Sequence, residues 1–396
     1  MAIYIILYAL AFSGYLFGAN RNKKNRKIYL FIVFSLILLV ASLRDITVGT
    51  DLKYYYSKYY PKFANASWNS LQSVTISGDW EWGFCAFCKL LCYVSTDVRL
   101  FIVVSSIVSI VPYGLFIEKN SKDVVFSTVL YLGCHMFSMN LCVIRQAMAV
   151  GIILCGIDLL KQKKTLKYCM VVILATLFHS SAVICFALIL CNYVSLKKNT
   201  MYLLAGAIIG LPLIYRVIFE RILKISYFSS VYGLYNNNAH ANGYVTIHTL
   251  GMFAVMLLIF VVGFLGYNDR SGRELPQESI VTRRSFGIKI GRLVLRMRKN
   301  VSEEMTYSFL MYAAYLATLF RMSAFIVNVT ARLSLYFMPF AMILYPEALI
   351  RIDNDNDKKI INFFVLGGIT AFALFIFAFR AESLWGIVPY SLYKYR

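Results

Sequence analysis

Three ionisable residues lie inside strongly apolar segments or at their turns, where charge is costly unless it meets a partner or water. They are Arg145, Arg332 and His179. An ionisable side chain at membrane depth is by default a candidate functional residue. Histidine can serve as a general base, and arginine binds phosphate through two parallel hydrogen bonds. The combination favours chemistry on an anionic, phosphate-bearing substrate.

A second polar group follows the apolar run 28–43. Gly49 is expected to form a turn, and Thr50 with Asp51 to cap a short helix that carries tyrosines 54–56. The charged residues at this point are Arg44, Asp45 and Asp51. An ordinary loop between membrane helices needs neither the turn nor the capped helix. We therefore expect the other polar groups of the chain to reach the same side of the membrane as this segment.

Composition defines the class of protein. Of 396 residues, 60% are hydrophobic and 15% charged, which predicts an all-α polytopic membrane protein with a single transmembrane domain over 1–396. The 40 Lys and Arg outnumber 19 Asp and Glu, but they cluster in short loops, as the positive-inside rule requires, so nucleic acid is not a predicted partner. Cys85, Cys88 and Cys92 share a helical face without histidine ligands, and we predict no metal site.

The basic loops set the predicted topology. The loop 21–27 is cytoplasmic, which makes 44–82 and 220–248 outer loops and 267–304 a basic cytoplasmic loop. Within the last, a helix over 286–299 is expected to lie amphipathically on the membrane. Helical hairpins are expected to turn outside at 138–140 and 178–181. With 83–95 as an outer interfacial helix, the count is about twelve spans.

Under this topology the polar groups converge on the outer face or the outer third of the bilayer. They are Arg44, Asp45, Asp51, Glu81, Arg145, His179, Arg321, Arg332 and Arg380. Structural alternatives stay open: Arg332 and Arg380 could extend to lipid headgroups, Asp51 could only cap a helix, and His179 could be a polar turn residue. Asp51 and Glu81 could also form a glycosidase carboxylate pair, which the excess of arginine disfavours.

Six short motifs occur in order along nearly the whole chain. They are Arg44-x-x-x-Val-Gly-Thr-Asp51, Glu81-Trp-Gly-Phe84, Arg145-Gln-Ala-Met-Ala149, Phe178-His179-Ser-Ser-Ala182, Arg332-Leu-Ser-Leu-Tyr336 and Pro389-Tyr390. With these motifs the chain resembles the EpsG-like family of Wzy-type polymerases, which join oligosaccharide repeat units of bacterial surface polysaccharides. The basic insert 267–304 is longer than this family pattern.

The resemblance implies a glycosyltransferase similar to GT-C-type enzymes, in the bacterial cytoplasmic membrane with its active site facing outside. It would join undecaprenyl-diphosphate-linked donor and acceptor units by inverting transfer, without a cofactor or metal, into O-antigen, capsule or exopolysaccharide. Implied partners are membrane lipids, a flippase and a chain-length regulator.

The resemblance also suggests roles for individual residues. The base would be His179 or Asp51, and the diphosphate would meet Arg145, Arg332 and Arg321. Sugars would be positioned by Arg44, Glu81, Tyr54, Tyr55, Tyr336 and Tyr390. The alternatives are a transporter or flippase for lipid-linked oligosaccharide, a membrane acyltransferase using His179, and a receptor without chemistry.

Overall fold

The computed structural model describes residues 1–75, 80–194, 196–197, 199–208, 210, 221, 245–270, 286–290, 293–297, 305–327, 330–352 and 354–393. The chain divides into two compact units. The first unit comprises Met1–Gly156, Met170–Val183 and Phe364–Arg396, and the second comprises Ile157–Cys169 and Ile184–Phe363. Each unit is described by itself. The outer loop 220–248 lies largely outside the described residues.

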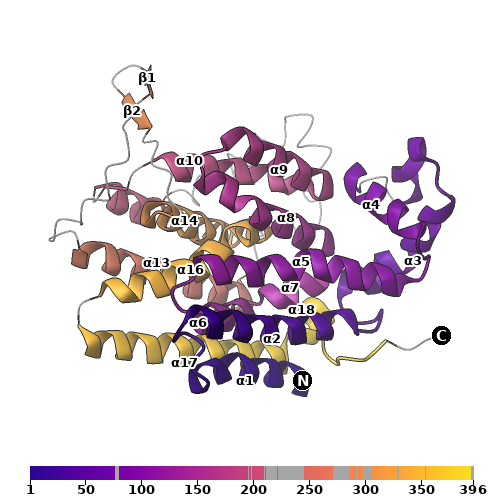
Figure 1. Ribbon diagram of the computed structural model, residues 1–396, viewed down its shortest axis with the longest axis horizontal. Coiled ribbons are helices and arrows are strands. Elements are labelled where there is room, and N and C mark those ends of the chain that lie inside the picture. The colour runs from indigo at the N-terminus through magenta and orange to yellow at the C-terminus, as the bar shows by residue number, and fades with distance from the viewer. Residues whose placement is uncertain are drawn as a thin grey trace. The chain divides into compact units, whose positions relative to one another are not determined.

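The first unit is built from helices, shown in Figure 1. Its elements are α1 (Ala2–Leu16), α2 (Lys23–Ser42), η1 (Leu52–Tyr56), α3 (Ser57–Tyr59), η2 (Tyr60–Asn65), η3 (Trp68–Val74), α4 (Trp82–Cys92), α5 (Val98–Asn120), α6 (Val124–Gly133), α7 (Met136–Cys142) and α18 (Ala381–Trp385). Three longer helices run through both units: α8 (Ile144–Lys161), α9 (Thr165–Phe178) and α17 (Asp355–Phe379). Within the segment 44–82, expected as an outer loop, residues 52–65 and 68–74 form short helical turns, and η2 and η3 pack on α4 or α5.

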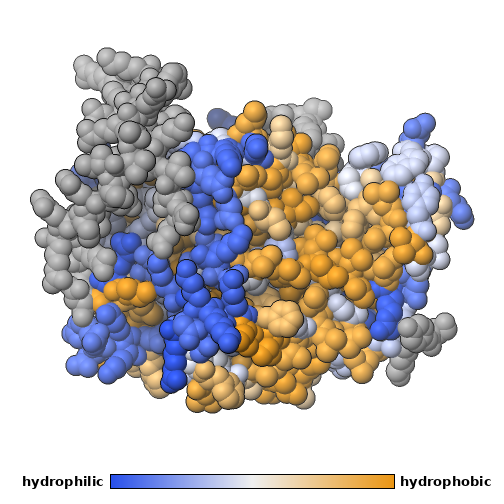
Figure 2. All heavy atoms as spheres, in the orientation of Figure 1, coloured by the Kyte–Doolittle hydropathy of each residue, from blue (hydrophilic) through white to orange (hydrophobic). Residues whose placement is uncertain are grey.

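The helices α2 and α5 pack side by side and show why this unit belongs in a membrane. Their outward faces expose large apolar side chains, among them Phe31, Leu39, Ile107 and Leu115. Figure 2 shows apolar residues over the middle of these helices, with hydrophilic residues toward both ends. Large apolar side chains exposed along helices of spanning length are favourable in contact with lipid chains and unfavourable in contact with water.

The two ends of the first unit gather different polar groups. At one end Asn20 donates to Asp123 (2.7 Å), and Arg26 donates to the carbonyls of Ser121 and Lys122. The expected basic loop 21–27, of which 23–27 form the start of α2, therefore lies against the loop 121–123 that follows α5. At the other end the C-terminal segment pairs with the segment after α2, through a bridge between Arg44 and Leu392. The polar residues that follow α2 are therefore held on the opposite end from the basic loop.

A close contact sets α8 against α5. Pro112 lies inside α5 and lacks an N–H, so the carbonyl of Val108, four residues earlier, has no intrahelical donor. Gly151 of α8 lies directly on that carbonyl oxygen, and a Cβ at position 151 would collide with it. The glycine lets the two backbones meet and fixes the position of the helix that begins beside Arg145.

The second unit centres on α13 (Ile247–Arg270), α14 (Tyr307–Ser323) and α16 (Met338–Arg351), which pack on one another. The short elements α10 (Ala187–Tyr193), α15 (Thr330–Leu333) and η5 (Ser334–Tyr336) pack on α14 or α16. Pro339 stands in the first turn of α16, where its missing N–H is tolerated, and the chain bends by 56° between η5 and α16.

The described part of the chain holds four helices long and apolar enough to cross a bilayer: α2, α5, α13 and α17. Two bent pairs, α6 with α7 (50°) and α15–η5 with α16 (56°), raise this number to six. Shorter apolar helices are α1, α4, α9 and the segment Ser180–Tyr193. The chain is therefore a helical, multi-pass membrane protein, while the predicted count of about twelve spans stays a prediction.

One predicted hairpin is confirmed, and the predicted turn of another is wrong in its position. The chain turns at His179 between α9 and η4 (Ser180–Phe186), and the far ends meet where Thr165 and Tyr193 share a hydrogen bond of 2.7 Å. The turn expected at 138–140 instead lies inside α7. The breaks fall at His135, which has a left-handed backbone (φ 56°), and at Val143. The apolar composition is uniform across 124–160, so hydropathy alone could not locate these breaks.

The amphipathic helix expected over 286–299 is also wrong. That stretch contains two antiparallel strands, β1 (Phe286–Ile290) and β2 (Leu293–Met297), with Phe286 opposite Met297. In β1 the apolar residues alternate with Gly287 and Lys289, β2 is rich in Leu and Val, and Gly287 and Gly291 lower the helix propensity. The apolar residues Phe286, Ile290, Leu293 and Met297 follow a helical spacing, but Phe286 with Ile290 and Leu293 with Met297 also lie on one face of a strand each.

Candidate active site

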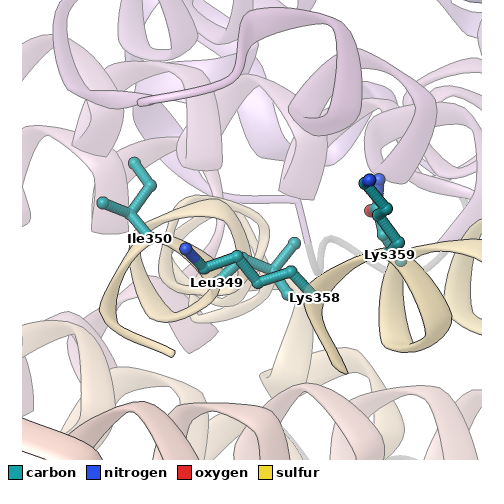
Figure 3. A pocket seen from close by; sticks show the side chains of 5 residues that line it. Leu349, Ile350, Lys358 and Lys359 are labelled. Carbon is teal, nitrogen blue, oxygen red and sulfur yellow. The ribbon is translucent and has the colours of Figure 1, made fainter. Parts of the chain in front are cut away.

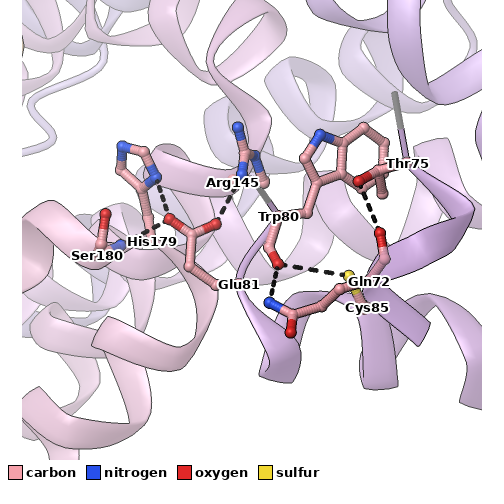
Figure 4. A network of polar contacts seen from close by, with 8 residues as sticks. All are labelled: Gln72, Thr75, Trp80, Glu81, Cys85, Arg145, His179 and Ser180. Carbon is pink, nitrogen blue, oxygen red and sulfur yellow. Dashed lines mark hydrogen bonds and ion pairs between the residues drawn. The ribbon is translucent and has the colours of Figure 1, made fainter. Parts of the chain in front are cut away.

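The carboxylate of Glu81 joins three segments of the first unit. Its Oε2 lies 2.7 Å from Arg145 Nη1, in the first turn of α8. Its Oε1 lies 3.1 Å from His179 Nδ1 and accepts the backbone N–H of Ser180 at 2.8 Å. Figure 4 shows the three groups converging on the carboxylate. Partners 64 and 98 residues away along the chain thus meet at one acid.

A glycine allows this meeting. Gly83, in the first turn of α4, lies so close to the end of α9 that an added Cβ would stand 2.6 Å from Leu177 Cβ and 2.8 Å from its carbonyl oxygen. Both distances are too short for any side chain. The start of α4 therefore rests directly on the last turn of α9, which brings Glu81 beside His179, two residues after Leu177.

The local environment keeps Glu81 ionised. Burial alone would raise the pKa of its carboxyl group, but the hydrogen bond and charge of His179, the charge of Arg145 and the Ser180 N–H lower this pKa to about 2. An ionised carboxylate only accepts hydrogen bonds, so the proton in the His179 contact lies on Nδ1. In the neutral imidazole the lone pair then resides on Nε2, which points away from Glu81 in Figure 4. Glu81 therefore sets the tautomer that a general base requires.

Arg145 sits where its charge needs compensation. It lies in the first turn of α8, next to the positive end of the helix dipole, which disfavours a cation. Besides the bond to Glu81, it interacts electrostatically with Asp51 and Tyr56, and its guanidinium lies over the Trp80 ring at 5.5 Å. Its side chain is 24% exposed, and that of His179 21%. Both groups can therefore be reached from outside the protein.

A group of buried aromatic rings packs beside the charged residues Glu81 and Arg145. The buried rings of Tyr56, Trp80, Phe84 and Phe101 contact one another, with centroid distances of 5.0 to 6.1 Å. The Trp80 carbonyl accepts the Gln72 amide at 2.7 Å, which ties the residue before Glu81 to η3. The acid therefore projects from a packed base and not from an open loop.

Several residues predicted for the site belong to this region. Asp51 makes no helix-capping bond, contrary to the prediction, although it lies in the helical run beginning at Thr50 and interacts with Arg145. Gly49 forms the expected turn (φ 102°). Tyr54 and Tyr55 are 54% and 45% exposed, so their rings are available to a ligand.

Direct sugar binding by Arg44 and by Tyr390 is not supported by the structure. Arg44 is 1% exposed, and its Nη1 donates to the Ala41 carbonyl and to Ser106. The Tyr390 hydroxyl donates to the Val40 carbonyl at 2.8 Å. The Tyr390 side chain holds the C-terminal segment against the end of α2, whereas the Arg44 side chain joins this end to α5. An arginine next to an apolar run could equally serve either purpose, so its sequence position did not decide between them.

Three predicted residues belong to the second unit. Arg321 is 3% exposed in α14, with Nη2 3.3 Å from the sulfur of Met338, and Tyr336 is fully buried. Arg332 is exposed on α15. Their convergence with Arg145 stays a prediction.

The sequence analysis did not single out Trp80, Gly83 or the Ser180 N–H. The motif Glu81-Trp-Gly contained a signal for Gly83, because a glycine two residues after an acidic turn residue is consistent with close backbone approach. Within the described ranges, no group of three His, Cys, Asp or Glu side chains is arranged to hold a metal ion.

Comparison with protein families gives one match. The model of the EpsG family aligns with residues 27–392, which is nearly the whole chain and includes Glu81, Arg145 and His179. The chain belongs to the EpsG family. Comparisons with curated proteins and with solved structures give no match. The family expected from the sequence motifs is thus confirmed.

Proposed function

We propose that this EpsG-family protein is a polymerase that joins lipid-diphosphate-linked oligosaccharide repeat units into a surface polysaccharide. The observation that carries the proposal is the Glu81 carboxylate, which orients His179 on one side and holds Arg145 on the other. Glycosyl transfer from a lipid diphosphate needs a base for the attacking hydroxyl and positive charge for the leaving group. Both are present within one cluster.

The proposed reaction is a single inverting displacement. An acceptor hydroxyl oxygen attacks the anomeric carbon of the donor sugar and loses its proton to His179 Nε2. The bond between the anomeric carbon and the phosphate oxygen breaks, and the lipid diphosphate leaves with the electron pair. Glu81 stabilises the imidazolium that forms, as a buried acid does for a catalytic histidine. The Arg145 guanidinium stabilises the developing charge on the diphosphate.

The surrounding residues suggest how the two substrates bind. The exposed rings of Tyr54 and Tyr55 offer stacking faces for sugars of the repeat unit. Exposed Arg332 is the candidate for a second diphosphate contact, whereas buried Arg321 is better suited to supporting α14. In this proposal the site faces outward from a bacterial cytoplasmic membrane, in a fold of about twelve spans similar to GT-C-type transferases, with undecaprenyl diphosphate as leaving group.

The test uses the purified full-length protein in detergent with undecaprenyl-diphosphate-linked repeat units as the only substrate. The wild-type protein should give a ladder of longer lipid-linked glycans and release undecaprenyl diphosphate. His179→Gln should reduce the rate by roughly 10²–10⁴-fold, since it removes the base and keeps the size of the side chain. His248→Gln, a change of the same kind in α13, serves as the matched control.

The outcomes separate the proposal from its main alternative. A flippase would move the units across a membrane without elongating them, so transport without a ladder would overturn the polymerase. A ladder that His179→Gln leaves unchanged would retain the polymerase but remove the proposed base.

A further inference from the structure

A second polar site lies in the second unit, where α16 ends and α17 begins. A hollow of about 280 Å³ is lined there by Leu349, Ile350, Lys358, Lys359 and Asn362. Figure 3 shows Lys358 extending beside Leu349 and Ile350, with Lys359 on the next part of α17. Two cations and two aliphatic side chains thus share one small surface.

The charge of this surface is only partly compensated. Lys358 pairs with Asp355 at 3.1 Å, but the Asp355 side chain is 81% exposed, so the ion pair lies in solvent and is weak. Lys359 is exposed. Asp357, the other acid in the first turn of α17, is exposed and does not line the hollow. The lining itself carries two cations and no carboxylate, so it favours an anion.

Asn362 adds a requirement for a hydrogen-bond donor. Its Oδ1 is buried, and among the described residues it has no hydrogen-bond partner. A buried acceptor without a donor destabilises the protein, because the free energy of removing it from water is not offset by a hydrogen bond. A ligand that brought a hydroxyl group to this oxygen would remove that cost.

The apolar neighbours indicate what else the ligand carries. Next to the lysines, α17 exposes Ile360 (54%) and Phe363 (74%), and Ile350 of α16 is 54% exposed. Lysines directly beside exposed aliphatic and aromatic side chains are typical of the boundary between lipid headgroups and acyl chains. A free anion would leave these apolar groups uncovered.

We propose that this hollow binds an anionic phospholipid whose headgroup carries hydroxyls, as that of phosphatidylglycerol does. The phosphate lies between Lys358 and Lys359, a headgroup hydroxyl donates to Asn362 Oδ1, and an acyl chain covers Ile350 and Phe363. This site is independent of the proposed polymerase activity, because none of its residues belongs to the Glu81 cluster.

Binding can be measured on the purified full-length protein with fluorescent phosphatidylglycerol, phosphatidic acid and phosphatidylethanolamine in mixed micelles. Lys358→Ala with Lys359→Ala should weaken binding of both anionic lipids by roughly thirtyfold. Asn362→Ala should weaken binding of phosphatidylglycerol by roughly fivefold. Binding of phosphatidic acid should stay unchanged, because this lipid lacks the headgroup hydroxyls. Phosphatidylethanolamine should bind weakest.

The matched control is Lys23→Ala with Lys24→Ala, because these two adjacent lysines begin the spanning helix α2 as Lys358 and Lys359 stand near the start of α17. An equal loss in this control would show general attraction to an anionic surface and overturn the site. If inorganic phosphate competed fully with the lipid, the ligand of this site would be a free anion and not a phospholipid. Equal effects of Asn362→Ala on both anionic lipids would reject the hydroxyl contact.

Discussion

Arg145 and Arg44 lie in the same unit, but the same type of side chain has a different role in each. Arg145 is bonded to a carboxylate, interacts with Asp51 and keeps 24% of its side chain exposed. Arg44 is buried, bonds to a backbone carbonyl and a serine hydroxyl, and has an Nε without a hydrogen-bond partner among the described residues. The first belongs to a reactive cluster and the second joins two chain segments. Partner type and exposure separate them, while residue type and hydropathy do not.

Among the changes that test this comparison, the largest effect is expected at the reactive arginine. Arg145→Ala should lower polymerisation by roughly 10²–10³-fold, because it removes the cation that faces the leaving group. Arg145→Lys should recover only part of this loss, since an ammonium cannot hold Glu81 and a phosphate in a fixed fork. Initial rates of undecaprenyl diphosphate release give the measurement. Full activity in both variants would place Arg145 with Arg44 as a structural residue.

The second prediction tests the close approach that assembles the cluster. Gly83→Ala should reduce the rate by roughly tenfold to a hundredfold, because a methyl group against Leu177 moves Glu81 away from His179. The control is Gly368→Ala, where a Cβ meets nothing within 4 Å. If both variants retain wild-type rates, the short contact at Gly83 does not position the acid.

The third prediction concerns the structural arginine. Arg44→Ala should reduce stability by roughly 2–4 kcal/mol, because it opens a cavity and removes two hydrogen bonds. Turnover per folded molecule should stay near that of the wild-type protein. Melting temperature and polymerisation are compared on the same monodisperse preparation. A loss of turnover at unchanged stability would instead restore the sugar-binding role that the sequence suggested.

The smallest effect concerns pH. Because the folded state lowers the pKa of Glu81 from 4.5 to about 2, ionised Glu81 stabilises the protein. This contribution, on the order of 3 kcal/mol at most, is complete above pH 4.5 and is lost as pH falls toward 2. Melting curves of the wild-type protein and Glu81→Gln should therefore approach each other between pH 4.5 and 3. A separation that is independent of pH over this range would mean that the Glu81 pKa is not lowered.

The sequence alone determined the class of protein, the hairpin that turns at His179 and the family. Each depends on local features: the apolar composition of a segment, a polar break within it, and short motifs in a fixed order. It also selected Arg145 and His179 as candidates, because ionisable side chains are rare in such segments, and it selected Glu81 through the motif Glu81-Trp-Gly-Phe84.

Only the tertiary structure decided what these candidates do. The distance from Glu81 to His179 depends on how closely α4 approaches α9, and the role of Arg44 depends on its bond to Ser106 of α5, 62 residues away along the chain. Likewise the break at His135 and the strands at 286–297 follow from backbone geometry that a uniform apolar or mixed composition does not specify. Hydropathy is a property of each segment, whereas the partner of a charge is set by segments that lie far apart in the chain and meet only when it folds.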